Sequence, residues 1–151
     1  MRYATIALLT LLFFSCEKGL TYEQQLQADI DDIKEYLADK NLTAQSTPSG
    51  LHYIITQEGT GAHPTINSTV TVNYIGKLLK NERVFDQTTG SPITFPLTGV
   101  IEGWQEGVPL LKKGGKGTFF IPSALGYGPT GAGGDIPANA PLIFEIELVD
   151  F

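Results

Sequence analysis

The stretch FPLTGVIEGWQEGVPLLKKGGKGTFFIP, residues 95–122, indicates the fold class most clearly. Within it, residues 101–108 have the length and composition of one short helix. We expect this helix to end at Pro109 and at the glycine pair 114–115, because proline lacks a donor and glycine suits a helix end. A strand is expected directly afterwards, at 117–122. The rest of the fold is therefore built around a single short helix.

Alternation of apolar and polar residues on both sides of this helix predicts β-strands. The strongest alternation covers residues 70–76 and the final stretch LIFEIELV, 142–149. Shorter extended segments are expected at 51–56, 84–86 and 93–97. Long strands combined with one short helix predict an α+β fold, in which an antiparallel sheet curls over the helix.

An N-terminal amphipathic helix is predicted ahead of the strands. Thr21 and Gln24 fit the capping box of a helix start, and Lys40 and Asn41 suit its end. Apolar residues recur on one face at helical spacing, at Leu26, Ile30, Ile33 and Leu37. The acidic residues are expected to form a solvated face: Asp29, Asp31, Asp32 and Glu35. Packing of the apolar stripe onto the same chain is favoured, and a homodimer through it is the alternative.

A polar, proline-containing linker is expected at residues 42–49, between the helix and the first strand.

The first sixteen residues, MRYATIALLTLLFFSC, have the pattern of a secretory signal. Arg2 precedes an apolar run at 5–14, which is shorter than the roughly 20 residues that a membrane-spanning helix needs. The run ends at Cys16, the only cysteine, and resembles a bacterial lipoprotein signal in which 1–15 are removed and Cys16 is lipidated. An ordinary signal peptide is the alternative. Lipidation would anchor the chain in the cell envelope, at the outer membrane and facing either the periplasm or the surface.

Composition excludes several functional classes. The chain carries 10 Lys and Arg residues against 16 Asp and Glu, a net charge of −6, which argues against nucleic acid as a partner. One cysteine and two histidines are too few for a disulfide framework or a structural zinc site, and no metal is predicted. Sequence motifs of serine hydrolases, dithiol oxidoreductases and zinc proteases are missing. The Gly/Lys-rich stretch 111–117 lacks the spacing of a phosphate loop, and we interpret it as a surface turn.

Aromatic residues in a setting rich in glycine and proline are the remaining candidates for chemistry. They are Tyr74, Phe85, Phe95, Trp104, Phe119, Phe120, Tyr127 and Phe144. Taken one at a time, each would be an ordinary core residue. One acid, Asp86, stands beside Phe85, and its burial there would demand a hydrogen-bond partner such as Tyr74.

The order of the motifs resembles the FKBP-type peptidyl-prolyl cis–trans isomerases over residues 48–151. The motifs are VNYIGKL, VFDQT, the stretch 95–122 quoted above and LGYGPTGAGGDIPANAPLIFEIELVDF. The resemblance implies a half-wrapped antiparallel sheet over one short helix, with a shallow apolar pocket for a proline ring. The expected organisation is a lipoprotein signal peptide at 1–15, a tether at 16–20, a helix and linker at 21–47 and an isomerase domain at 48–151.

The resemblance also implies roles for individual residues. Those expected to be catalytic are Tyr74, Phe85, Asp86 and Tyr127. Those expected to bind substrate are Val100, Ile101, Trp104, Ile136 and Phe144. Trp104 would be the pocket floor, while the Tyr127 hydroxyl and the Ile101 N–H would bind substrate carbonyls. Two roles for Asp86 stay open: a brace for its loop or an electrostatic role near the twisting amide.

The expected function is isomerisation of X–Pro bonds in unfolded or nascent envelope proteins. No cofactor is needed, because the barrier is lost amide resonance and a dry apolar pocket lowers it without a nucleophile. Macrolide inhibitors are a further expected ligand class. The sequence departs from the family in the short loop after Asp86, which lacks arginine, and at Ile93, Ala132 and Asp135. The alternatives are a holdase-type chaperone or an interaction module that uses the same pocket.

Overall fold

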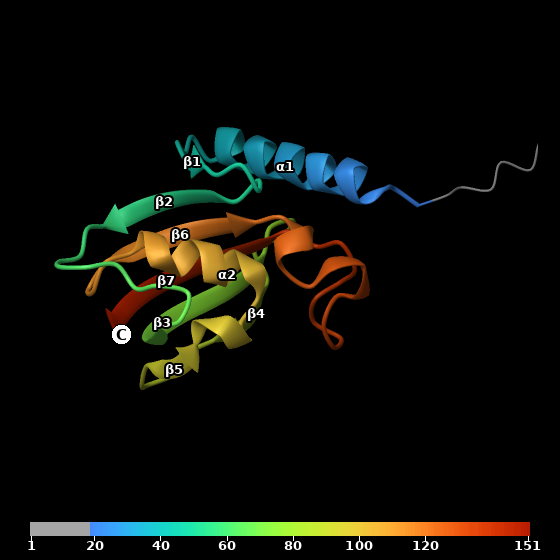
Figure 1. The fold of residues 1–151 in the computed structure, drawn as a ribbon. Coiled ribbons are helices and arrows are strands. Elements are labelled where there is room, and N and C mark those ends of the chain that lie inside the picture. The colour runs from blue at the N-terminus through green and yellow to red at the C-terminus, as the bar shows by residue number, and fades with distance from the viewer. Residues whose placement is uncertain (1–18) are drawn as a thin grey trace, which may run out of the picture.

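The computed structural model describes residues 19–151 (Figure 1). The predicted signal peptide and Cys16 lie outside the described residues. Two α-helices are present in the described part, α1 (Tyr22–Asp39) and α2 (Glu102–Gly107). Within this part of the chain, neither helix combines the length and the apolar character needed to cross a membrane.

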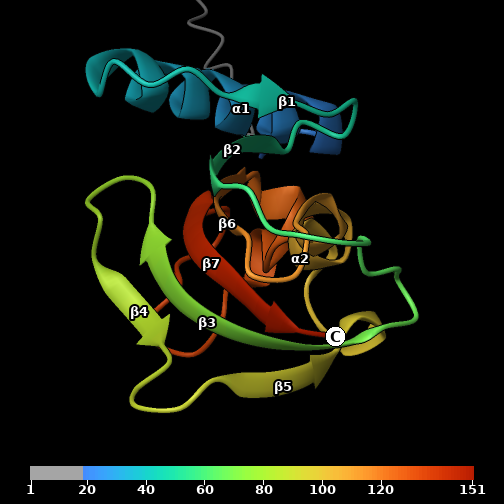
Figure 2. The same ribbon diagram turned by 90° about the vertical axis from the view of Figure 1, so that its left-hand side faces the viewer.

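Within residues 19–151, seven strands form one antiparallel sheet. They are β1 (Gln45–Ser46), β2 (His52–Gln57), β3 (Thr69–Leu78), β4 (Val84–Gln87), β5 (Ile93–Pro96), β6 (Lys116–Ile121) and β7 (Leu142–Asp150). Their order is β1-β2-β6-β7-β3-β4, and β5 also pairs with β3. Figure 2 shows the sheet curving around the side on which α2 lies. The predicted α+β fold, an antiparallel sheet wrapped over one short helix, is confirmed.

The inner core lies between the concave face of the sheet and α2. Alternate residues of β3, Val70, Val72 and Tyr74, are buried in it. The helix approaches closely because two of its positions are glycines. A Cβ atom at Gly103 would lie 2.5 Å from Ile121 Cγ2, and one at Gly107 would lie 2.8 Å from a ring carbon of Phe119. Only glycine therefore allows α2 to sit this close to β6.

The helix α1 covers the opposite face of the sheet. Its Ile33 and Leu37 are buried with Leu79, Phe120 and Ile143, a group called here the outer cluster. The apolar stripe therefore packs onto its own chain, which was the favoured interpretation. The start of the helix is also as predicted, because the Thr21 hydroxyl accepts a hydrogen bond from the Gln24 N–H and the Gln24 side chain accepts one from the Thr21 N–H.

Three local expectations need correction. Asp29 is not on a solvated face: its side chain is only 1% exposed. Pro109 does not end the helical segment, because it stands early in the 3-10 turn Val108–Leu110, where a missing N–H is tolerated. The segment 42–49, expected to be a linker, contributes β1, which pairs with β2.

Candidate active site

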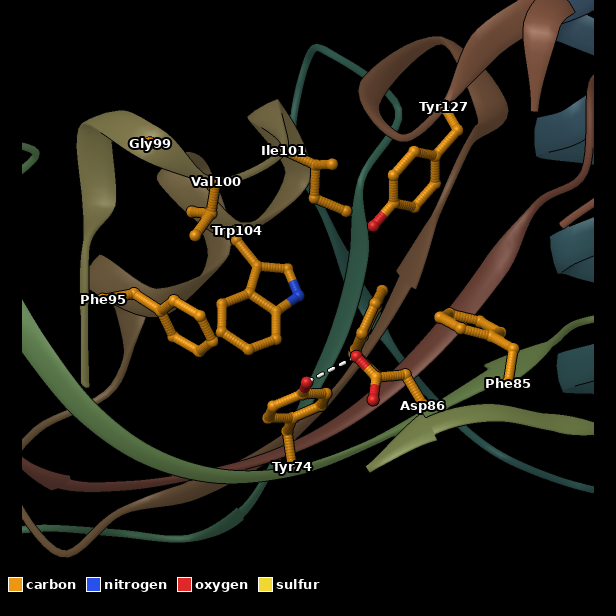
Figure 3. Close-up of a pocket in the computed structure, with 10 residues that line it drawn as sticks. Tyr74, Phe85, Asp86, Phe95, Gly99, Val100, Ile101, Trp104 and Tyr127 are labelled. Carbon is orange, nitrogen blue, oxygen red and sulfur yellow. Dashed lines mark hydrogen bonds between the residues drawn. The ribbon is translucent and has the colours of Figure 1, made fainter. Parts of the chain in front are cut away.

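A cavity of about 300 Å³ opens between α2 and the concave face of the sheet (Figure 3). Its walls come from β3, β4, β5, β7, α2 and the loops before and after them. The lining residues are Tyr74, Phe85, Asp86, Phe95, Gly99, Val100, Ile101, Trp104, Tyr127 and Phe144. Segments far apart in the chain therefore supply one apolar pocket with few polar groups.

Trp104 is held by three aromatic rings that meet its indole edge-on. The ring centroids of Tyr74, Phe144 and Phe95 lie 5.1, 5.3 and 5.9 Å from that of Trp104, with interplanar angles of 83°, 88° and 90°. Edge-to-face packing of this kind fixes the orientation of a ring. The indole Nε1 is buried and has no hydrogen-bond partner among the described residues. Trp104 thus provides a rigid and almost entirely apolar surface.

The side wall of the pocket depends on Gly76 in β3. In the sheet, Gly76 lies opposite Asp86 of β4 and opposite Phe144 of β7. A Cβ atom at this position would lie 2.7 Å from Phe85 Cζ and 2.8 Å from Phe144 Cε1. The missing side chain lets Phe85 and Phe144 meet edge-on above the strand, with 5.6 Å between their centroids.

Asp86 is joined to the sheet by Tyr74. The Tyr74 hydroxyl donates to Asp86 Oδ2 over 2.6 Å, as predicted, and the Gln87 N–H donates to Asp86 Oδ1 over 2.9 Å. The expected burial of Asp86 is wrong: it lies exposed at the rim, because β4 is an edge strand of the sheet. Burial, and then the hydrogen bond to Asp86, raise the pKa of Tyr74 above its ordinary value. The phenol is therefore a stable donor at neutral pH.

Two donors at the pocket remain free for a ligand. Tyr127 is half-buried, and its hydroxyl points into the pocket (Figure 3) without a hydrogen-bond partner among the described residues. Burial, followed by the negative charge of Asp86, raises the pKa of Tyr127, so this phenol also stays protonated. The Ile101 N–H precedes α2 and donates to no other backbone group within residues 19–151. Both groups suit a carbonyl oxygen.

The structure brings together eight of the nine residues expected at the pocket. Ile136 is the exception, because it is buried in the inner core and does not line the cavity. Phe95 and Gly99 line it but were not assigned to it from the sequence. Phe95 stood in the aromatic set, whereas Gly99 gave no signal other than its place before Val100. The roles assigned to individual residues remain predictions.

Comparisons with a family model, with curated proteins and with solved structures all point to the same family. The family model described as FKBP-type peptidyl-prolyl cis-trans isomerase matches residues 61–149. The chain is 51% identical over 107 residues to the probable FKBP-type peptidyl-prolyl cis-trans isomerase FkpA of Neisseria meningitidis serogroup B, covering 70% of this chain and 39% of that protein. It is 46% identical over 104 residues to the outer membrane protein MIP of Legionella longbeachae, covering 68% and 44%. A crystal structure of a peptidyl-prolyl cis-trans isomerase from Pseudomonas syringae pv. tomato matches with a TM-score of 0.71 at 32% identity, covering 88% of this chain and 97% of that one.

The extent of these matches decides what they establish. The chain spans less than half the length of the two curated relatives, so the likeness concerns a part of each. The family model, however, covers more than half of this chain, and every residue that lines the pocket falls inside the matched range. The fold, the pocket and the sequence agree, and the chain belongs to the FKBP-type peptidyl-prolyl cis–trans isomerase family.

Proposed function

We propose that the chain is a peptidyl-prolyl cis–trans isomerase that acts on X–Pro bonds of unfolded or nascent proteins. The observation that carries the proposal is the aromatic pocket with free donors from Tyr127 and Ile101 beside the Trp104 surface. Rotation about an X–Pro bond has a barrier of about 18–20 kcal/mol, which comes from the loss of amide resonance. Neither a nucleophile nor a proton transfer is required to lower it.

The pocket would act on the charge distribution of the amide. The planar amide is charge-separated and is favoured by water, whereas the twisted form is less polar. Moving the bond from water onto apolar rings therefore disfavours the planar form and lowers the barrier. Trp104 would receive the proline ring, and Phe85 and Phe144 would flank it.

The polar groups would orient the peptide around the rotating bond. Tyr127 would donate to one carbonyl of the substrate and the Ile101 N–H to another, leaving the amide between them free to turn. The Tyr74 hydrogen bond supports a bracing role for Asp86, since it ties β4, and Phe85 with it, to β3.

The activity is tested with a chromogenic X–Pro peptide whose trans form alone is cut by a coupled protease. The full chain is expected to accelerate the slow phase, and Trp104→Leu is expected to reduce the acceleration while unfolding remains cooperative. A folded wild-type chain that leaves the slow phase unchanged would overturn the proposal. Suppression of aggregation of a proline-free client, measured in parallel, tests the holdase alternative.

Ligand binding has its own signal, because Trp104 is the only tryptophan. Proline peptides and macrolide inhibitors are expected to change its emission, since its ring borders the pocket. Unchanged emission at a ligand concentration that saturates binding by calorimetry would place the ligand elsewhere.

We also propose a location in the bacterial envelope with a lipid anchor at Cys16. The name of the Legionella longbeachae relative, an outer membrane protein, supports the location. The apolar run that ends at the only cysteine supports lipidation. Cys16→Ser is expected to move the chain from the membrane to the soluble fraction, or to leave it uncleaved. Normal processing with unchanged membrane association would contradict the anchor.

A further inference from the structure

The N-terminal helix carries a buried carboxylate that the proposed mechanism does not use. Asp29 of α1 is 1% exposed. Its Oδ2 accepts hydrogen bonds from the Ser123 N–H over 2.7 Å and from the Ser123 hydroxyl over 2.5 Å, and its Oδ1 accepts one from Gln25 Nε2 over 2.7 Å. Burying a carboxylate is costly unless donors surround it, and here three donors do so without a positive charge among them.

Two of these three donors belong to one residue at the start of the loop that carries Tyr127. Ser123 is itself 1% exposed and begins the 3-10 turn Ser123–Leu125, directly after β6. Figure 1 shows this turn, in orange, beneath the blue N-terminal half of α1. Asp29 thus holds both the main chain and the side chain of Ser123, which leaves the start of the loop a single orientation.

The turn transmits this orientation to the pocket. The Leu125 N–H donates to the Pro122 carbonyl over 2.9 Å, and the Gly126 N–H donates to the Ser123 carbonyl over 3.0 Å. Leu125 is buried in the inner core, so the turn is fixed on this side as well. Tyr127 follows immediately. Every residue between Ser123 and Tyr127 is therefore part of a hydrogen-bonded turn or of its end.

We propose that Asp29 is a positioning residue for Tyr127, and that α1 thereby belongs to the active unit. The proposal rests on the proposed isomerase function. An apolar residue at position 29 would leave the buried N–H and hydroxyl of Ser123 without an acceptor, so Asp29 contributes stability as well as orientation. A carboxylate adds direction, since it holds two donors of one residue at fixed angles. It sets where the Tyr127 hydroxyl stands over the pocket.

The test compares variants of the full chain on X–Pro peptides. Asp29→Ala removes the acceptor and is expected to raise KM about fivefold, the equivalent of one hydrogen bond, with kcat unchanged. Asp29→Asn retains an acceptor for Ser123 and should restore most of the wild-type KM. Asp31→Ala is the matched control: Asp31 is exposed on the same helix and accepts from Gln27 over 2.8 Å at the same four-residue spacing.

A double-mutant cycle separates positioning from a loss of folded protein. In a Tyr127→Phe chain, Asp29→Ala should raise KM no further, because the hydroxyl that it positions is gone. The proposal would be overturned if the fold-changes in KM of the two single variants multiplied in the double variant. A wild-type KM in Asp29→Ala, or a decrease in kcat alone, would overturn it as well. If Asp29→Ala does not fold, Ser123→Ala deletes one contact from the loop side and is tested in the same cycle with the same outcomes.

A spectroscopic measurement keeps this inference apart from the proposed activity. If the folded wild-type chain did not accelerate X–Pro isomerisation, the proposed activity would be overturned, but the contact between α1 and the loop would not. In chains with 13C-labelled tyrosine, the Tyr127 ring signals, assigned through Tyr127→Phe, should shift in Asp29→Ala and stay in place in Asp31→Ala. If the chemical shifts of the Tyr127 ring were unchanged in Asp29→Ala, the positioning role would be overturned, whether or not the chain is an active isomerase.

Discussion

The two faces of the sheet are both buried, yet different kinds of side chain meet on them. Neighbouring residues on the same strands point to opposite sides: Phe119 and Phe144 join the inner core, whereas Phe120 and Ile143 join the outer cluster under α1. The inner face around the pocket is built of rigid aromatic rings that meet edge-on and leave a space between them. The outer cluster is mainly aliphatic, and the cavity beside it is lined by charged residues of α1, among them Asp32, Glu35 and Asp39. We infer that ring shape makes the inner face a binding surface, while the outer face supplies stability and places α1.

The largest effect is expected from emptying the outer face. Phe120→Ala removes a ring that is 1% exposed and should lower the free energy of unfolding by about 3–5 kcal/mol. Urea unfolding measures this change. KM for X–Pro peptides, measured on the protein that remains folded, should stay at the wild-type value, because Phe120 does not line the cavity. A loss well below 1 kcal/mol would show that α1 does not pack here in solution.

A smaller effect is expected from crowding the inner face. Gly76→Ala places a methyl group against Phe85 and Phe144, so the partly buried Phe85 should be displaced into the cavity. The expected loss of stability is about 1–3 kcal/mol, together with weaker binding of proline peptides in the Trp104 fluorescence titration. Gly134→Ala is the control, because no atom lies within 4 Å of its added Cβ. Equal binding by both variants would refute the role of Gly76.

The smallest effect is expected at the rim. Tyr74→Phe keeps the ring but loses the hydrogen bond to Asp86. The free energy of unfolding should fall by only about 1 kcal/mol, because the exposed carboxylate can bind water instead. Since the pKa of Tyr74 is raised in the folded chain, the stability from the protonated phenol is present below its ordinary pKa of about 10 and is lost as pH rises through the folded-state pKa. The melting temperature should decrease less steeply with rising alkaline pH in Tyr74→Phe than in the wild-type chain. An equal decrease of the melting temperature with pH in both chains would show that Tyr74 is not the group responsible.

Local patterns in the sequence predicted most of the fold. The cap at Thr21, the alternation of the long strands and the composition of the short helix are all local sequence patterns. All three elements are present, the short helix as Glu102–Gly107. The pocket could not be predicted from local patterns alone, because its walls come from segments that meet only in the folded chain. Eight of its residues were predicted through the family resemblance, and the aromatic pattern alone did not distinguish pocket from core.

The errors arose where tertiary contacts override a local rule. Asp29 is three residues after Leu26 and four before Ile33, so it lies beside the apolar stripe, and helical spacing could have indicated its burial. Nothing in the sequence pointed to Ser123 as its partner, ninety-four residues away along the chain. The exposure of Asp86 was likewise hidden, because it depends on β4 being an edge strand.

The central claim is that the substrate binds and isomerises on the inner face of the sheet, and one paired measurement tests it most directly. Trp104→Leu and Phe120→Leu each replace a buried ring with leucine, one on each face, and kcat/KM is measured for both on the same X–Pro peptide after cooperative unfolding is verified. We predict that Trp104→Leu lowers kcat/KM by about tenfold or more, equivalent to about 1.4 kcal/mol of transition-state stabilisation, while Phe120→Leu stays near wild type. Equal losses in the two variants, or a loss in Phe120→Leu alone, would contradict the account.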